Sequence, residues 1–513
     1  MTDALLPALI EQMMQPDFYP HPVVEPIQLI QTHVSYVLLT GDFAYKVKKA
    51  VNFGFLDFST LEKRHHFCEE ELRLNQRGAA ELYLSVLPIT QEGNRFCLAG
   101  EGEPVEYVVK MKQFSAGTLF TDLFDRGELT EELLEQLAIV LAEFHAKATT
   151  NDYIRSFGTV AQVRQSIDEN YEQTVAYIGG PQTQAQFDQT REYTDRLFAE
   201  QEALFNRRIE QDRIRECHGD VHLRNIALWH NQILLFDCIE FNEPFRFVDV
   251  MFDIAYIIMD LDARGRQDLS NRFLNAYLEQ TGDWEGLLVL PLYLSRQSYV
   301  RAKVTSFLLN DPSIPEAVKQ EAAQTATRYY QLAWEYTQPK AGQIILMSGL
   351  SGSGKSTVAR QVSSLTGGIQ IRSDAVRKHL AGIGLNQRGD DSLYFPEMTQ
   401  KTYDRLLTLG TTLAQQGYTV ILDAKYDQQG LRQAVMEAAT EHQIPIHILY
   451  CTAPTPVLQE RIQSRVGDIS DATTDVLTQQ QMDPFTVAEQ SIVLTLDQGD
   501  ILPSLILSHI GRA

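Results

Sequence analysis

Residues 349–356 read GLSGSGKS, which has the spacing G-x-x-x-x-G-K-[ST] of a phosphate-binding loop. The loop follows the apolar run 343–348, and residues 356–365 after it have helical spacing. Such a strand–loop–helix unit points backbone N–H groups and a helix N-terminus at one anion. Lys355 is expected to reach the β- and γ-phosphates and Ser356 to bind Mg²⁺. The sequence thus predicts a nucleoside triphosphate site, with the loop residues Gly349, Leu350, Ser351, Gly352, Ser353, Gly354, Lys355, Ser356 and Thr357.

Apolar segments alternate with helical segments after this loop. The apolar segments are 344–347, 369–371, 420–422, 446–449 and 492–496. Alternation of this kind predicts a parallel sheet wrapped by helices. A boundary is expected at 337–342, where proline and glycine end a helical pattern. We therefore predict an α/β multidomain chain with a first domain at 1–338 and a P-loop α/β domain at 341–513.

Composition narrows the class of protein. The chain has 513 residues and a formal charge of −23. Residues 341–513 hold 13 Lys and Arg against 17 Asp and Glu, and the remainder holds 31 against 50. Nucleic-acid backbones are bound by clustered positive charge, so the acidic front part does not favour nucleic acid as a partner. Five scattered cysteines fit a reducing cytoplasm, and neither a basic signal segment nor a membrane-spanning apolar stretch is expected.

The front part changes character along its length. Its first hundred residues are rich in strand patterns, whereas helical spacing dominates from 119 to 336. A small sheet lobe followed by a helical lobe is the layout of a kinase. We expect the lobes at about 1–111 and 118–338, with 112–117 as the hinge over adenine.

The string HGDVHLRN at 218–225 carries the front part's chemistry, followed by a strand that ends at Asp237. A kinase catalytic loop has an Asp, an Asn a few residues later, and a second Asp about a dozen residues on. Asp220 is expected to accept the proton of the substrate hydroxyl, while Asn225 and Asp237 hold Mg²⁺. His218 is expected to brace the loop rather than react.

A cation from the sheet lobe is also required. Lys46 and Lys48 share one face of the expected strand 43–49, because strand side chains repeat every two residues. Lys46 is our choice to reach the phosphates and to pair with a carboxylate of the helix that carries Glu69, Glu70 and Glu71. Glu70 is assigned here, although the pattern leaves the choice among these three open.

Residues 30–260 resemble the aminoglycoside-phosphotransferase-like branch of the protein-kinase fold. The resemblance rests on FAYKVKK, HGDVHLRN, the strand LLFD and Asp253-Ile254-Ala255. The stretches THVSYVLLTGDFAYKVKK and FGFLDFSTLEKR resemble a bacterial subgroup in which this domain is fused to a P-loop domain. No G-x-G-x-x-G precedes Lys46, which departs from protein kinases but is common in small-molecule kinases of this family.

The rear part is similar to the zeta-toxin and polynucleotide-kinase group of P-loop, AAA-type kinases. This resemblance implies that Asp374 activates the acceptor hydroxyl and that Arg377 holds an acceptor anion. Asp423, at the end of a strand, would orient Mg²⁺. Arg461 and Arg465 would close over the transferring phosphate as part of a lid that includes VGDISDAT.

Together these patterns predict a bifunctional phosphotransferase that uses ATP and Mg²⁺ and phosphorylates hydroxyl groups of small molecules. In one alternative the front domain is a pseudokinase that senses nucleotide, and only the rear domain reacts. In the other, the rear domain phosphorylates the 5′-hydroxyl of a nucleic acid.

Overall fold

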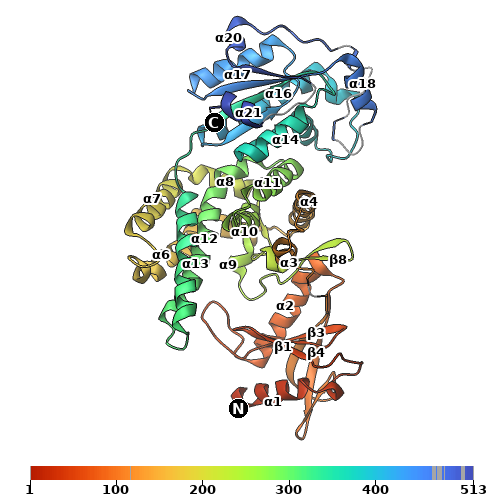
Figure 1. Ribbon diagram of the computed structural model, residues 1–513. Coiled ribbons are helices and arrows are strands. Elements are labelled where there is room, and N and C mark those ends of the chain that lie inside the picture. Colours follow the sequence, from red (N-terminus) through yellow and green to blue (C-terminus); the bar gives the residue numbers. More distant parts are fainter. Residues whose placement is uncertain are drawn as a thin grey trace. The chain divides into compact units, whose positions relative to one another are not determined.

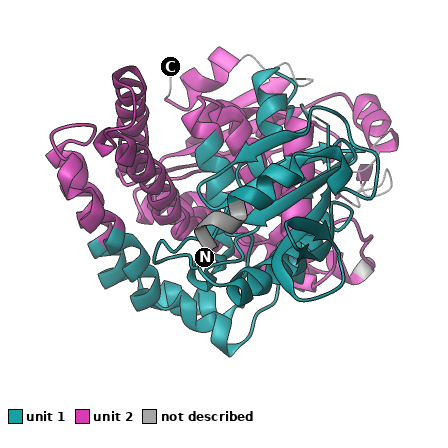
Figure 2. Ribbon diagram, turned by 90° about the horizontal axis from the view of Figure 1, so that it is seen from below, with its two compact units in different colours: residues 1–130, 143–169, 195–260 teal, residues 131–142, 170–194, 261–513 magenta. Residues whose placement is uncertain are grey.

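The structure is a computed structural model that describes residues 2–115, 117–464, 469–470, 477–478, 480–497 and 503–511. Its residues divide into two compact units (Figure 2). Unit 1 comprises 1–130, 143–169 and 195–260, and unit 2 comprises 131–142, 170–194 and 261–513. These units are defined by how residues pack and do not test the domain boundary expected near 338–341. That boundary stays a prediction.

Unit 1 begins with a six-stranded antiparallel sheet in the order β1-β2-β3-β6-β4-β5. The elements of this lobe are α1 (Thr2–Met13), β1 (Gln28–Gln31), β2 (Ser35–Leu39), β3 (Phe43–Lys48), α2 (Leu61–Ala79), β4 (Tyr83–Glu92), β5 (Arg95–Leu98) and β6 (Pro104–Lys112). Strand β1 ends at Gln31, where Thr32 and Ser35 close a turn through their side chains. Helix α1 buries Leu9 and Met13 against the sheet.

The rest of unit 1 is built mainly of helices around two small antiparallel pairs. One pair joins β7 to β10, and the hairpin β8–β9 follows the catalytic string. The bounds are α3 (Phe120–Asp125), α5 (Asp152–Arg155), α8 (Glu202–Glu210), β7 (Ile214–Glu216), β8 (Ile226–Trp229), β9 (Gln232–Leu235), α9 (Glu243–Arg246) and β10 (Phe247–Asp249). Four helices have residues in both units: α4 (Glu131–Lys147), α6 (Val160–Thr174), α7 (Gln184–Glu200) and α10 (Val250–Ala263).

Unit 2 contains the expected five-stranded parallel sheet, in the order β12-β13-β11-β14-β15. Its strands are β11 (Gln343–Ser348), β12 (Ile369–Arg372), β13 (Thr419–Asp423), β14 (Ile446–Thr452) and β15 (Val493–Asp497). Its helices are α11 (Gln267–Thr281), α12 (Leu290–Phe307), α13 (Glu316–Glu335), α14 (Lys355–Thr366), α15 (Ser373–Ala381), α16 (Pro396–Gln415), α17 (Gln429–Glu441), α18 (Thr455–Gln463), α20 (Val487–Gln490) and α21 (Pro503–His509). Figure 1 labels most of these helices.

Successive side chains of the parallel strands point to opposite faces of this sheet. Ile345 and Ile421 belong to one apolar cluster with residues of α14 and α21. Leu422 points to the other face, where its side chain approaches Gly410 of α16. Burial on both faces explains why the strands read as short continuous apolar runs. Among the described residues, no helix is long and apolar enough to cross a membrane.

Gly342, just before β11, offers a test of this packing. A Cβ added there would lie 1.9 Å from the carbonyl oxygen of Ala414 in α16, so backbone would have to move. We expect Gly342→Ala to destabilise the protein by about 1–3 kcal/mol, in the range of overpacked cores. The matched control is Gly384→Ala, which meets no heavy atom within 4 Å. Denaturant unfolding followed by circular dichroism measures both, and equal midpoints for the two variants would contradict this account.

Candidate active sites

The HGDVHLRN string forms a loop between β7 and β8, and the hairpin β8–β9 brings Asp237 back beside it. The side-chain nitrogen of Asn225 donates to the carbonyl oxygen of Asp220 at 3.0 Å. The backbone N–H of Phe236 donates to the carbonyl oxygen of Asn225 at 3.1 Å. Asp237 has a left-handed backbone, with φ of 63°, at the end of the hairpin. The structure therefore brings together Asp220, Asn225 and Asp237, as their spacing predicted.

The two histidines of the string differ in surroundings. His218 is buried, its Nε2 lies 2.9 Å from the carbonyl oxygen of Phe236, and its Nδ1 accepts from the N–H of Asp220 at 3.3 Å. Both ring nitrogens thus bind backbone, as expected of a brace. His222, which the sequence left without a role, lies with Nε2 3.4 Å from the Asp220 carboxylate.

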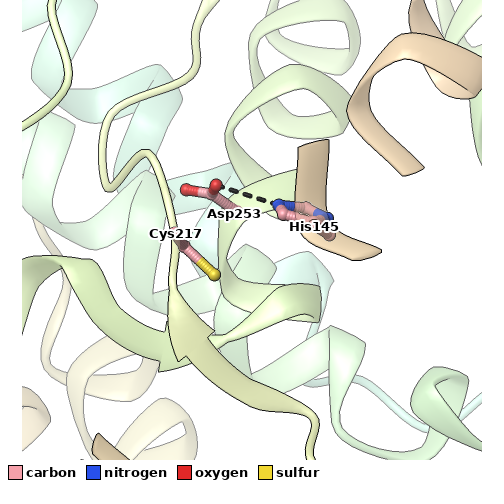
Figure 3. A group of neighbouring side chains, drawn as sticks. All are labelled: His145, Cys217 and Asp253. Atoms are coloured by element: carbon pink, nitrogen blue, oxygen red, sulfur yellow. Dashed lines mark hydrogen bonds and ion pairs between the residues drawn. The ribbon is translucent and has the colours of Figure 1, made fainter. Parts of the chain in front are cut away.

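The carboxylate of Asp253 binds the HGDVHLRN loop through two backbone N–H groups. Its carboxylate oxygens accept from His218 and Gly219, each at 2.8 Å. His145 Nε2 lies 3.1 Å from the same carboxylate (Figure 3). Burial opposes ionisation of Asp253, but these hydrogen bonds and the positive surroundings hold its pKa below the usual range.

Figure 3 also shows Cys217 beside this pair. A histidine, a cysteine and a carboxylate together resemble a metal-ligand set. The Cys217 thiol, however, donates to the carbonyl oxygen of Val248 at 3.5 Å. The Asp253 carboxylate already accepts from two backbone N–H groups of the loop, each at 2.8 Å. We therefore interpret the cluster as a support of the HGDVHLRN loop.

Lys46 joins the sheet lobe to this loop. Its ammonium group lies 2.8 Å from Asp237 and 2.8 Å from Glu71. Burial favours the neutral lysine, but the two carboxylates outweigh it and raise the pKa of Lys46 well above its usual value. Lys46 thus contacts a carboxylate of α2 and Asp237 at the same time.

The assignment of Glu70 is wrong, because Glu71 is the carboxylate that faces the strand. Glu71 is fully buried, whereas Glu70 lies on another side of α2 and pairs with Arg73 at 2.8 Å. Successive helix residues point about 100° apart, so one position decides which carboxylate reaches Lys46. Burial opposes ionisation of Glu71, but Lys46 and Lys48 keep its pKa below the usual range.

Sequence reasoning missed a second buried ion pair next to the first. Lys48 lies 2.6 Å from Glu71 and also pairs with Glu240, three residues after Asp237. The exposed fractions of the side chains of Lys48, Glu71 and Glu240 are 1%, 0% and 7%. The spacing of Lys46 and Lys48 hinted at a shared partner, but nothing local marked Glu240.

The opposite end of α2 is also fixed. Arg73 and Arg77 reach Glu216, which directly precedes the catalytic loop, at 2.7 and 3.5 Å. Arg77 also donates to the carbonyl oxygen of Cys217 at 3.1 Å. Helix α2 therefore contacts both the Asp237 segment and the base of the loop.

Residues present in this site fit a magnesium ion. The Asp237 carboxylate already pairs with the ammonium group of Lys46. The side-chain nitrogen of Asn225 donates to Asp220, which leaves the amide oxygen of Asn225 as the atom that could bind a metal. Carboxylate and amide oxygens are suitable ligands for Mg²⁺. In the expected hinge, β6 ends at Lys112 and Gln113 donates to the carbonyl oxygen of Asp42 at 3.0 Å. Ala116 of that segment lies outside the described residues.

In unit 2, the loop between β11 and α14 has the backbone of a phosphate cradle. Gly349, Gly352 and Gly354 have positive φ values of 141°, 82° and 89°. A Cβ at Gly349 would lie 2.2 Å from the carbonyl oxygen of Cys451, and one at Gly352 would lie 2.6 Å from that of Leu458. Only glycine fits such positions, which explains the spacing of the motif.

The polar groups of this cradle differ in whether they have a partner. The Ser353 hydroxyl is buried and has no hydrogen-bond partner in the part of the chain that the structure describes. The N–H of Ser351 donates to Gln480 at 3.0 Å, a contact that the motif did not predict. Lys355 donates to the carbonyl oxygen of Leu350 at 2.8 Å, and burial lowers its pKa.

A cavity of about 720 Å³ opens over the loop. Its lining includes Ser351, Gly352, Gly354, Lys355, Ser356, Thr357, Asp374, Arg377, Asp423 and Arg461. Gly349, Leu350 and Ser353 complete the loop but are not among the lining residues. The sequence missed three further cations of the lining, Arg372, Arg388 and Lys425, because their segments carry no motif.

Asp374 and Arg377 lie together on α15, as their spacing predicted, 3.2 Å apart. The guanidinium of Arg377 also stacks on the ring of Tyr394, 4.9 Å from its centre. Its Nε is buried and has no partner among the described residues. Arg461 reaches the loop from α18, within 3.6 Å of where a Gly354 Cβ would lie. Arg465 lies outside the described residues.

Asp423 ends β13 beside the loop, and the side chain of Gln370 donates to it at 2.9 Å. Ser356 and Asp423 both line the cavity. A hydroxyl and a carboxylate at a P-loop fit a magnesium ion, which is usually held by few protein groups together with phosphates. The residues present therefore suit MgATP.

Comparison with known proteins finds two family models, the phosphotransferase enzyme family APH at 87–290 and the AAA domain family AAA_33 at 344–484. Uncharacterized proteins of Mycobacterium bovis and Mycobacterium tuberculosis are 31% identical over 462 residues, which cover 89% of this chain and 90% of theirs.

Solved structures give similarities to parts of the chain. A sugar kinase from Janibacter matches 34% of this chain and 96% of its own, at 22% identity and a TM-score of 0.26. A choline/ethanolamine kinase family protein from Mesorhizobium loti matches 64% of this chain and 99% of its own, at 9% identity and a TM-score of 0.38. An ADP-bound aminoglycoside phosphotransferase covers the same shares at 12% identity and a TM-score of 0.34.

Replacing Lys48 tests the buried charge network. Lys48→Met leaves Glu71 and Glu240 buried without this cation, and breaking such a pair typically costs about 3–5 kcal/mol of unfolding free energy. Adding Glu240→Gln should restore part of the loss. The control is Lys63→Met, which removes a half-exposed lysine from its ion pair with Asp57 and should change little. Denaturant midpoints decide, and a Lys48→Met midpoint equal to that of Lys63→Met would refute the role given to Lys48.

Proposed function

We propose that this chain, which belongs to the same family as the mycobacterial proteins, is a bifunctional ATP-dependent phosphotransferase with one site in each half. Both matched families are kinase families, so the chain is an enzyme of the kinase class. Each half would transfer the γ-phosphoryl group of ATP to a hydroxyl of a small molecule. The observation that carries the proposal is that Lys46, Glu71 and Asp237 converge in one half, while the other half has a glycine cradle around Lys355.

In the front site, catalysis would consist of positioning and charge neutralisation. Asp220 would orient the acceptor hydroxyl and accept its proton. Lys46 would exchange its contact with Asp237 for the nucleotide phosphates while keeping Glu71. Asn225 and Asp237 would hold Mg²⁺, which neutralises the phosphate charge when bound.

In the rear site, the N–H groups of the loop and Lys355 would bind the β- and γ-phosphates. Asp374 would accept the proton of the acceptor hydroxyl, and Arg461 would neutralise charge that develops on the transferring phosphate. Ser356 and Asp423 would hold or orient Mg²⁺. The buried Nε of Arg377 supports an acceptor that carries an anionic group.

Two observations favour an alternative for the front half. Lys46 is already paired with Asp237, and no G-x-G-x-x-G precedes Lys46 in the sequence, so this half could bind nucleotide without transferring phosphate. Phosphorylation of any acceptor by a chain whose rear site is disabled would exclude that pseudokinase.

For the rear half, the cation-rich cavity leaves a 5′-hydroxyl of nucleic acid as a second candidate acceptor. An assay with labelled ATP and 5′-hydroxyl oligonucleotides at low salt tests this alternative, and absence of labelling would exclude it.

Five free cysteines support a location in the reducing cytoplasm.

Single variants separate the two sites. We expect Asp220→Asn to lower the front activity by about 10²–10⁴-fold, because the general base is lost. We expect Lys355→Ala to abolish the rear activity, because the loop loses the lysine that would bind the β- and γ-phosphates. Each variant should spare the other activity, which serves as its internal control. A screen of a metabolite pool with labelled ATP measures both, and turnover like wild type by both variants would overturn the site assignments.

A further inference from the structure

Helix α11 provides side chains that cover the edge strand β12 of the parallel sheet. The amide nitrogens of Asn271 and Asn275 donate to the carbonyl oxygen of Gly368 at 2.9 and 3.1 Å. The N–H of Gln370 donates to the side-chain oxygen of Asn275 at 2.7 Å. An exposed sheet edge presents unpaired backbone groups, and here side chains of α11 satisfy some of them. The position of β12 therefore depends on a helix that precedes the P-loop by some 70 residues.

Two side chains of β12 continue from this contact to Asp423. Gln370 donates to one Asp423 carboxylate oxygen at 2.9 Å. Arg372 places its Nε 4.0 Å from the same oxygen. Both residues are next to the loop, since Gln370 also donates to the carbonyl oxygen of Ser356 at 3.4 Å and Arg372 lines the cavity. Asp423 is thus held by its neighbours on β12.

Glu279 of α11 competes with Asp423 for the same arginine. Its carboxylate lies 3.5 Å from Nη1 of Arg372, and both side chains are largely buried, with exposed fractions of 26% and 10%. His379 Nε2 lies 2.8 Å from the carbonyl oxygen of Glu279 and links that helix end to α15. Opposite charges about 4 Å apart attract each other strongly at partly buried sites, so a full ion pair with Arg372 would oppose a metal at Asp423. Glu279 opposes this pairing, because its carboxylate attracts the same Arg372 side chain.

We propose that Glu279 and Asn275 are positioning residues of the P-loop site, which keep Asp423 available for Mg²⁺ by holding Arg372 and Gln370 in place. The proposal rests on the proposed function of the rear half. It extends that site beyond the residues of the motif to a helix outside the expected domain 341–513. Residues that orient metal-binding groups through a second contact typically change metal affinity by about 10–100-fold when replaced.

Metal binding provides the test, with the full chain in an Asp237→Asn background that weakens the front metal site. Mn²⁺ serves as the probe, and its binding in the presence of a nonhydrolysable ATP analogue is followed by electron paramagnetic resonance. Glu279→Gln should weaken Mn²⁺ binding on the order of tenfold, because Arg372 then moves onto Asp423. Glu279→Asp keeps the charge and should recover most of the affinity. Metal-free binding of the analogue should stay as in the background chain.

The matched control is Glu285→Gln. Glu285 also forms an ion pair between the residues before the P-loop domain and a helix of that domain, with Arg405 of α16, but Arg405 does not line the cavity. Its removal should leave Mn²⁺ affinity unchanged.

Two outcomes would overturn the proposal. One is a Glu279→Gln chain that binds Mn²⁺ as tightly as the Glu285→Gln chain. The other, which decides the matter if Glu279→Gln does not fold, is an Asn275→Ala chain with unaltered Mn²⁺ affinity, since a loss of about threefold or more is expected there. Failure of the proposed function is distinguishable, because it would appear as analogue binding that Lys355→Ala does not weaken.

Discussion

The pairing of buried lysines with Glu71 is the interaction on which the front site depends. A buried ammonium group is unfavourable unless carboxylates lie beside it, and Lys46 and Lys48 share Glu71 for this purpose. Their other partners, Asp237 and Glu240, belong to the segment after the catalytic loop. One carboxylate of α2 therefore links the sheet, the helix and the segment 237–240. The relative positions of these segments therefore depend on the ion pairs that Lys46 and Lys48 form with the three carboxylates.

Patterns among neighbouring residues predicted the individual segments. The loop GLSGSGKS, the five apolar runs and the spacing of Asp220, Asn225 and Asp237 can each be recognised in short stretches of sequence, although the parallel strands themselves pair with strands far along the chain. The parallel sheet and the phosphate cradle were accordingly found where the sequence placed them. Asp374 and Arg377 met because one helical turn joins them.

Long-range partners could not be predicted in this way. Glu70 was chosen over Glu71 because the sequence did not fix the rotation of α2 about its axis, and a change of one residue turns the side chain by about 100°. Glu240 and Gln480 reach their sites across 192 and 129 residues, with no spacing that marks them. The contacts of α11 with β12 likewise depend on packing, since Asn275 and Glu279 read as ordinary helix residues.

We propose above all that the chain builds two separate pockets for a magnesium nucleotide. Isothermal titration calorimetry of the full chain with Mg²⁺ and a nonhydrolysable ATP analogue measures the number of these pockets most directly. We expect two nucleotides bound per chain. A stoichiometry of one or less at saturation would contradict it.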